Sequence, residues 1–235
     1  MQKNTTLPDW ELVLSAAARL QRILPEAVLV GGTASAIHAG HRFSRDADHV
    51  LTDLRMRFDE VLAELESVAG WKPPRVQRPV QILGSLDGIE TGVRQLIRVA
   101  PLETMVLEHR GERLTVSTPD EILRIKGVLI LKRNATRDYL DFVALAANMG
   151  DEKVAYALHD FDRLYAQENG ESPLQQLQVQ LAHAVPYDMD EVETELPKYK
   201  NLAPQWHDWD TVKAACAHLS TVIFDGVCGL RDGGS

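Results

Sequence analysis

The chain has 235 residues, enough to bury one large or two small hydrophobic cores. Its apolar content of 45% and charged content of 25% are ordinary for a globular protein, and no apolar run approaches the roughly 20 residues of a membrane span. The net charge of −9 argues against sequence-independent coating of nucleic acid, although it allows a local basic patch and suits a basic partner.

Two further features concern the cellular compartment. The first ten residues lack the apolar core of a signal peptide. Cys216 falls on the apolar stripe of a predicted helix, which favours a buried reduced thiol over a disulfide with Cys228. We therefore expect a cytoplasmic protein.

Helical and extended patterns alternate in the first third of the chain. In chain order we expect a helix over ~8–24, a buried strand over 27–30, a short helix over 33–39, a strand over 46–52 and a helix over 58–68. A glycine turn, Gly31-Gly32, separates the first strand from the short helix, and Gly70 closes the last helix.

A strand-rich stretch and a helical region follow. Turn residues such as Asp87-Gly88 separate apolar runs across 74–116, which predicts a β-meander. Thr118-Pro119-Asp120-Glu121 combines a capping hydroxyl, a proline suited to the first helical position and a capping-box glutamate, so a helix begins there. Helical spacing then continues almost to the C-terminus. The sequence predicts an α+β protein, with an α/β core over 1–116 and a helical region over 117–235.

The stretch 31–48 joins a glycine turn and a hydroxyl to two carboxylates. It reads Gly31-Gly32-Thr33-Ala-Ser-Ala-Ile-His-Ala-Gly-His-Arg42-Phe-Ser44-Arg-Asp46-Ala-Asp48. Glycine lets backbone N–H groups approach a phosphate closely, and Thr33 can donate a hydroxyl where a helix N-terminus points. These groups suit a nucleoside triphosphate held on a divalent cation.

The two carboxylates share one face of the predicted strand, because alternate side chains of a strand point the same way. The Cα atoms of Asp46 and Asp48 are expected ~6.6 Å apart, so the carboxylates can converge on one Mg²⁺ or on two ions ~4 Å apart. His49 is expected to point away from this carboxylate face.

The spacing D-x-D is not distinctive by itself, because it occurs three more times. The other copies are Asp160-Phe-Asp162, Asp188-Met-Asp190 and Asp208-Trp-Asp210. Residues two apart diverge on a helix, so the first and last copies are expected to be solvated charges or helix caps. Asp46 and Asp48 differ in their context of strand, glycine turn, short helix and second strand.

In this order the segment resembles the nucleotidyltransferase superfamily, and more narrowly the AbiEii/AbiGii-type toxins of type IV toxin–antitoxin systems. A second motif supports the resemblance: a helix with Lys126, the basic residue Arg133 two turns later, and then Arg137-Asp138-Tyr-Leu-Asp141. The similarity covers roughly residues 27–147. It implies a nucleotidyltransferase-like mixed β-sheet flanked by helices, followed by a helical C-terminal region.

The resemblance also implies which residues form the site. Its residues are triphosphate-binding Gly31, Gly32 and Thr33, metal-binding Asp46 and Asp48 with Ser44 beside them, and Lys126, Asp138 and Asp141 of the second motif. Lys126 would contact phosphates or the nucleobase. The implied metal is Mg²⁺ or Mn²⁺.

For several cationic residues the sequence allows two interpretations. Lys126 and Arg133, seven residues apart, share a helix face that either neutralises a triphosphate or is a solvated flank. Arg42 either binds phosphate or pairs with the first strand carboxylate. His38 and His41 are expected to be packing or surface residues rather than metal ligands.

A third carboxylate is harder to place. Polymerase-type sites use such a group on a neighbouring strand as the base for the attacking hydroxyl. Asp87 falls in the expected Asp-Gly turn, and residues 93–98 contain no acid, so the base is Glu90, Asp141 or absent. Asp141 itself either acts in the site or forms an i,i+4 ion pair with Arg137.

The function that these features predict is metal-dependent transfer of a nucleoside monophosphate from an NTP to an acceptor hydroxyl. The family resemblance implies an RNA acceptor such as a tRNA end, growth inhibition, and a cognate antitoxin protein. The alternatives are an inactive nucleotide-binding module, if the third acid is missing, and a transferase that acts on a small molecule or a protein hydroxyl. No membrane partner is expected.

Overall fold

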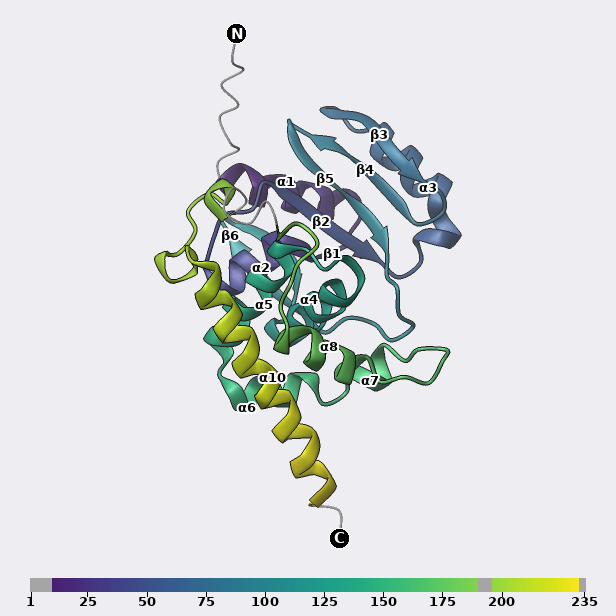
Figure 1. The fold of residues 1–235 in the computed structure, drawn as a ribbon. Helices are drawn as coiled ribbons and strands as arrows, with labels where there is room; N and C mark the ends of the chain where they lie inside the picture. Colours follow the sequence, from purple (N-terminus) through teal and green to yellow (C-terminus); the bar gives the residue numbers. More distant parts are fainter. Residues whose placement is uncertain (1–9, 190–195, 233–235) are drawn as a thin grey trace. The chain divides into compact units, whose positions relative to one another are not determined.

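The computed structural model describes residues 10–189 and 196–232 (Figure 1). The chain forms two compact units: Met1–Ala34 with Phe43–Ser117, and Ser35–Arg42 with Thr118–Ser235. It therefore passes into the second unit within a helix, returns at Phe43, and leaves the first unit again after Ser117.

A seven-stranded mixed sheet forms the first unit. Its strands are β1 (Val28–Leu29), β2 (Asp46–Leu51), β3 (Trp71–Gln77), β4 (Gln81–Leu86), β5 (Ile89–Gln95), β6 (Thr104–His109) and β7 (Glu112–Ser117). They lie in the order β3-β4-β5-β2-β1-β7-β6. The pairs β2–β5 and β1–β7 are parallel, and the other pairs are antiparallel. This confirms the predicted mixed sheet.

The stretch 74–116 is not the single meander that was predicted. The strands β3, β4 and β5 do pair consecutively, and β6 and β7 form a hairpin. However, β5 pairs in parallel with β2, and β6 lies at the far edge of the sheet beside β7. Alternation of apolar residues identifies a strand but not its partner, because the partner is chosen by packing among residues distant in sequence.

Two helices, α1 (Trp10–Ile23) and α3 (Leu54–Glu66), pack against one face of this sheet. The buried cluster that joins them to it comprises Leu20, Leu24, Ala27, Leu51, Leu54, Phe58, Val61, Leu65, Ile82, Leu86 and Val93. The predicted helix over ~8–24 is confirmed as α1, although residues 8 and 9 lie outside the described part of the chain.

The helix α2 (Gly31–Ala39) begins two residues earlier than predicted. The pair Gly31-Gly32 therefore begins this helix, and the chain bends at Gly31, where φ is +70°. Similarly, α3 begins at Leu54, before the predicted start at residue 58. Apolar spacing locates the body of a helix better than its first turn.

Beyond α2, the described residues of the second unit form mainly helices. Its elements are α4 (Pro119–Arg133), α5 (Thr136–Met149), α6 (Asp151–Leu158), α7 (Phe161–Leu164), α8 (Pro173–Ala182), the 3₁₀ turns η2 (Leu196–Lys198) and η3 (Pro204–Trp206), and α10 (Trp209–Asp232). Thr118 accepts a hydrogen bond from the backbone N–H of Glu121 at 3.2 Å, which confirms the predicted start of α4.

The helix α5 is the most buried element of this unit, and it contacts α4, α6 and α10. Cys216 of α10 is a buried free thiol, as predicted, and burial raises its pKa to about 12. Among the described residues, no helix combines the length and the apolar character that crossing a bilayer requires.

Candidate active site

Asp46 and Asp48 lie on the same face of β2. Both are half-buried, whereas Ala47, His49 and Leu51, which alternate with them, are buried on the core side. The imidazole of His49 bonds to the carbonyl of Ala47 at 3.1 Å, and burial lowers its pKa to about 4. The ring is therefore neutral near pH 7 and points away from the carboxylates, as predicted.

Gly31 brings the backbone after β1 directly against Asp48. Its φ of +70° lies in the region that favours glycine, and a Cβ there would lie 3.2 Å from both Cβ and Oδ2 of Asp48. The backbone N–H of Val30 also donates to the Asp48 carbonyl at 2.9 Å. A larger residue at position 31 would strain the backbone and displace a candidate metal ligand.

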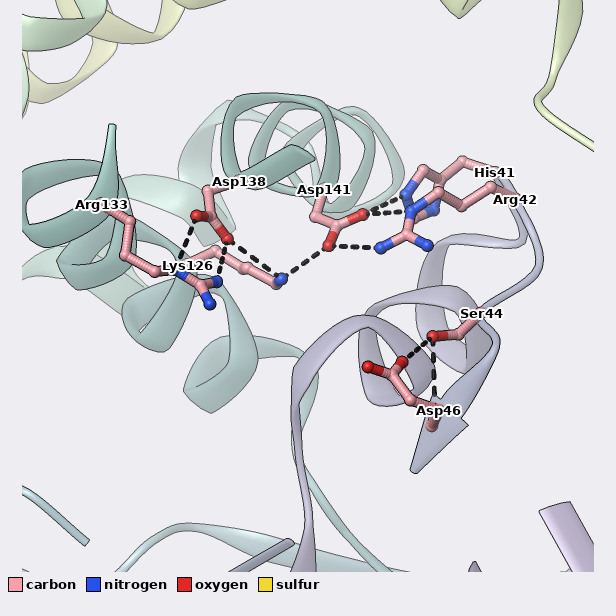
Figure 2. A network of polar contacts seen from close by, with 8 residues as sticks. All are labelled: His41, Arg42, Ser44, Asp46, Lys126, Arg133, Asp138 and Asp141. Atoms are coloured by element: carbon pink, nitrogen blue, oxygen red, sulfur yellow. Dashed lines mark hydrogen bonds and ion pairs between the residues drawn. The ribbon is translucent and has the colours of Figure 1, made fainter. Parts of the chain in front are cut away.

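Two hydroxyl groups hold the start of β2. Thr33 is fully buried and donates to the backbone carbonyl of Asp46. Ser44 donates to the Asp46 carboxylate, at 2.9 Å from its Oδ1 (Figure 2). Thr33 thus fixes the strand and Ser44 orients a carboxylate, while Gly32 is half-buried in the first turn of α2.

A cavity of about 320 Å³ opens beside the two carboxylates. Its lining comprises Asp46, Asp48, Arg75, Leu83, Gly84, Ser85, Glu90, Thr91 and Arg94. A volume of this size lies in the range of small-molecule binding sites. The first unit alone supplies all of these residues.

Glu90 is the carboxylate that the sheet places next to Asp46. The parallel register of β2 and β5 pairs these two residues directly, and paired residues of a sheet point to the same face. Asp87, the other candidate in this stretch, occupies the predicted turn with a φ of 54° and pairs with Arg19. The signal missing from the sequence was the pairing of β2 with β5.

The donor set suits a hard divalent cation. Asp46, Asp48 and Glu90 offer carboxylate oxygens, which Mg²⁺ and Mn²⁺ prefer. Within residues 10–189 and 196–232, no three His, Cys, Asp or Glu side chains are placed to hold a metal ion by themselves. Mg²⁺ usually takes one or two carboxylates together with substrate phosphates, and Asp46 and Asp48 fit such a site.

The second unit contains a separate polar network around Asp141 of α5 (Figure 2). This buried carboxylate accepts hydrogen bonds from His41 Nε2 at 2.7 Å and from Arg42 Nε and Nη2 at 2.7 and 2.9 Å, and it lies 2.6 Å from Lys126 Nζ. Burial opposes ionisation, but the Arg42 and Lys126 charges and the His41 hydrogen bond keep the pKa of Asp141 well below its usual range. Asp141 is therefore an anion at neutral pH.

Asp138 is the second carboxylate of this network, again fully buried. Arg133 donates to both of its oxygens, at 2.7 and 3.1 Å, and Lys126 Nζ lies 3.4 Å from Oδ1. Lys126 is only 2% exposed, so the interpretation of a solvated flank is wrong for this residue. Its ammonium is held between two carboxylates.

Arg42 and His41 have partners that the sequence did not reveal. Arg42 forms a bidentate pair with Asp141, which neither sequence-based alternative included. His41, expected to be a packing or surface residue, is buried and hydrogen-bonded to the same carboxylate. These contacts join residues about 100 positions apart, so no local spacing could have indicated them.

The other D-x-D copies either bond to residues at helix starts or carry exposed charge. Asp208 accepts from the backbone N–H of Thr211 at 3.1 Å, and Asp162 accepts from that of Leu174 at 2.8 Å. This confirms the expectation for the first and last copies. In the middle copy Asp188 bonds to Thr136, whereas Asp190 lies outside the described residues.

Comparisons with known proteins give a family model and a solved structure that each match most of the chain. The family model described as "Nucleotidyl transferase AbiEii toxin, Type IV TA system" matches residues 13–215. The structure described as "Crystal structure of putative nucleotidyltransferase from H. pylori" aligns over 97% of this chain and 98% of its own, with a TM-score of 0.56 and 16% identity. At that identity the structural likeness concerns the fold.

Two curated relatives match over a small part of their own length. The "Heme uptake protein MmpL11" of Mycobacterium tuberculosis (strain ATCC 25618 / H37Rv) is 31% identical over 183 residues, which are 67% of this chain and 17% of that protein. The "Mycolic acid-containing lipids exporter MmpL11" of Mycolicibacterium smegmatis is 31% identical over 134 residues, which are 54% of this chain and 13% of that protein. This chain therefore spans less than a fifth of these relatives.

The family match includes both motifs and all of the candidate site residues from Gly31 to Asp141. It agrees with the mixed sheet, the strand carboxylates and the helical C-terminal region. From this match we conclude that the chain belongs to the AbiEii family of nucleotidyltransferase toxins.

Proposed function

We propose that this nucleotidyltransferase moves a nucleoside monophosphate from an NTP to a hydroxyl of RNA, such as a tRNA end, with Mg²⁺ or Mn²⁺ bound at Asp46 and Asp48. The observation that carries the proposal is the cavity lined by Asp46, Asp48 and Glu90, next to the Gly31 bend. Membership of the AbiEii family supports nucleotidyl transfer and a toxin role.

The chain's own groups around the cavity have distinct roles in this proposal. Asp46 and Asp48 hold the cation, and Ser44 keeps the Asp46 carboxylate in place. The first turn of α2 from Gly31 presents backbone N–H groups to the triphosphate, because helix N-termini attract phosphate. When bound, the cation neutralises the phosphates and stabilises the charge that develops in transfer.

Glu90 is the proposed base. The acceptor hydroxyl loses its proton to this carboxylate as its oxygen forms a bond to the α-phosphorus. The bond from that phosphorus to the bridging oxygen of pyrophosphate breaks in line, so pyrophosphate leaves with the bonding electron pair. Glu90 can take this role because it is exposed and pairs with Asp46 across the strands.

Arg42, Lys126 and Arg133 stay in the proposal as nucleotide-binding residues. These three cations surround two carboxylates, Asp138 and Asp141, which leaves one positive charge in excess. This excess of positive charge, with the Arg133 side chain 38% exposed, supports an anionic ligand at the network. Asp141 positions Arg42 and Lys126 rather than receiving a proton, because its pKa is held low.

The proposed protein partner is a cognate antitoxin. The family description places the chain in a type IV toxin–antitoxin system. The net charge of −9 suits a basic partner surface, since opposite charges steer association.

The test is label transfer with the purified protein, total RNA, Mg²⁺ and NTPs labelled at the α-phosphate. We expect RNA to become labelled, and the label to disappear with EDTA or in Asp48→Asn. Asp210→Asn is the matched control, because it removes an exposed carboxylate from another D-x-D copy.

The other outcomes of the same experiment contradict the proposal in different ways. NTP binding without transfer to any acceptor indicates a nucleotide-binding module. Label on protein or on a small molecule, with none on RNA, indicates a different acceptor class. Label on RNA that persists in Asp48→Asn removes that residue from the metal site.

A further inference from the structure

One face of the sheet continues from the candidate metal ligands across three more strands. The registers pair Asp48 with Gly92 of β5, Gly92 with Leu83 of β4, and Leu83 with Arg75 of β3. Residues paired in this way share a face, and the row spans about 14 Å between its outer Cα atoms. The cavity follows this row, because it is lined from Asp48 to Arg75.

The middle of the row lacks large polar side chains. Gly92 contributes no side chain, and a Cβ there would lie 2.2 Å from the carbonyl oxygen of Ile82, so only glycine fits. Leu83 is half-buried and provides an apolar surface. The cavity therefore has carboxylates at one end and Arg75 at the other, and only a glycine and a leucine lie between them in this row.

A second arginine lies along the side of this cavity. Arg94 of β5 lies 3.7 Å from Asp48 through its Nε, and it donates to Gln81. Its side chain is 43% exposed. Arg75 is exposed, and within the described part of the chain its guanidinium forms no ion pair. Two guanidinium groups thus line the cavity: Arg75 is available to an anion, whereas Arg94 is held by Asp48 and Gln81.

We propose that Arg75 and Arg94 bind the phosphodiester next to the attacking hydroxyl of the acceptor RNA strand. This inference rests on the proposed function and specifies the acceptor side of the same site. Guanidinium groups suit phosphate because their fork of N–H donors matches phosphate oxygens.

The strand order explains why this phosphate is that of the acceptor rather than that of the NTP. The bend at Gly31 follows β1, which flanks β2 on one side, whereas β5, β4 and β3 extend from its other side. The triphosphate lies at the start of α2, so the cavity over β5 to β3 is left for the acceptor. Glu90 lies on this side, beside the hydroxyl whose proton it takes.

The charges make RNA binding depend on the divalent cation. Asp46, Asp48 and Glu90 outweigh the two arginines by one negative charge. A divalent cation changes this balance to one positive charge and competes with Arg94 for Asp48, so Arg94 becomes available to phosphate.

The test measures equilibrium binding of a 5′-labelled single-stranded RNA oligonucleotide with a free 3′ hydroxyl, by fluorescence anisotropy with and without Mg²⁺. We expect Arg75→Gln and Arg94→Gln each to weaken RNA binding about tenfold in Mg²⁺, since each removes one charge-assisted contact. The slope of log K against log salt should fall by about 0.7 for each variant. Lys72→Gln is the matched control: it removes an exposed cation from the same strand, outside the cavity lining.

A parallel measurement of NTP binding distinguishes a phosphate of the acceptor RNA from the triphosphate of the NTP. The Kd of the best NTP substrate should be unchanged in Arg75→Gln, whereas equal weakening for NTP and RNA would assign the arginines to the triphosphate and overturn the proposal. RNA affinity that is unchanged in both variants would also overturn it. If the wild-type protein labels no RNA at all, the proposed function fails. If it labels RNA and the variants retain the wild-type KM for RNA, only this inference fails.

Discussion

Replacing Asp141 with asparagine should destabilise the protein strongly. The carboxylate is fully buried and holds Arg42 through two hydrogen bonds and Lys126 at 2.6 Å. In Asp141→Asn both cations stay buried without this counter-charge. Loss of one partner from a buried ion pair costs about 3–5 kcal/mol of unfolding free energy. That loss is a large fraction of the 5–15 kcal/mol that domains usually have.

Urea denaturation followed by circular dichroism at pH 7 measures this loss directly. The corresponding fall in Tm is about 6–20 °C for a chain of this size. Asp210→Asn is the control and should change stability by less than about 1 kcal/mol, because its ion pair with Lys213 is exposed. Adding Lys126→Met to Asp141→Asn should recover part of the loss, because one uncompensated charge is removed.

The difference in stability between wild type and Asp141→Asn depends on pH because the pKa of Asp141 is lowered in the folded protein. A carboxyl group whose pKa is lower in the folded state stabilises the fold fully above its unfolded pKa of about 4. The stabilisation is lost as the pH falls below that value toward the pKa that the carboxyl group has in the folded protein. The gap between wild type and Asp141→Asn should therefore be constant from pH 6 to 8 and narrow only below about pH 4. A variant with wild-type stability at pH 7 would refute the reasoning.

Three more predictions concern the described residues. Gly31→Ala should cost about 1–2 kcal/mol from its positive φ and also reduce transfer, because the new Cβ crowds Asp48; unchanged melting and activity would contradict this. Glu90→Gln should lower kcat by about 10²–10⁴ while the NTP KM and the Tm stay unchanged, and an undiminished kcat would remove it as the base. Cys216 should resist iodoacetamide at pH 8 in the folded protein and react in urea, as peptide mass spectrometry can establish.

Local signals in the sequence predicted the elements well. The start of α4 was readable because Thr118, Pro119 and Glu121 lie within one turn and act on each other directly. The alternation along β2 was readable for the same reason, and it separated the faces of Asp48 and His49. Features set by neighbouring residues can be predicted because their partners lie within a few positions.

Features set by distant residues could not be predicted in the same way. The place of Glu90 beside Asp46 depends on parallel pairing between strands more than 30 residues apart. The contacts of Asp141 with His41 and Arg42 cross about 100 residues. Charge identity alone does not select a partner, because the sequence offers many carboxylates and cations, and tertiary packing decides which of them meet.

The passage of Ser35–Arg42 into the second unit limits how this protein can be dissected. A fragment that begins at Thr118 keeps Lys126 beside Asp141 but lacks Arg42 and His41, so this buried carboxylate would lose three of its hydrogen bonds. Conversely, a fragment that ends at Ser117 carries Ser35–Arg42 without the residues of the second unit that this segment belongs with. Two such halves would restore the network together only if the amino-terminal half contributed Ser35–Arg42, which makes the protein a poor candidate for modular domain exchange.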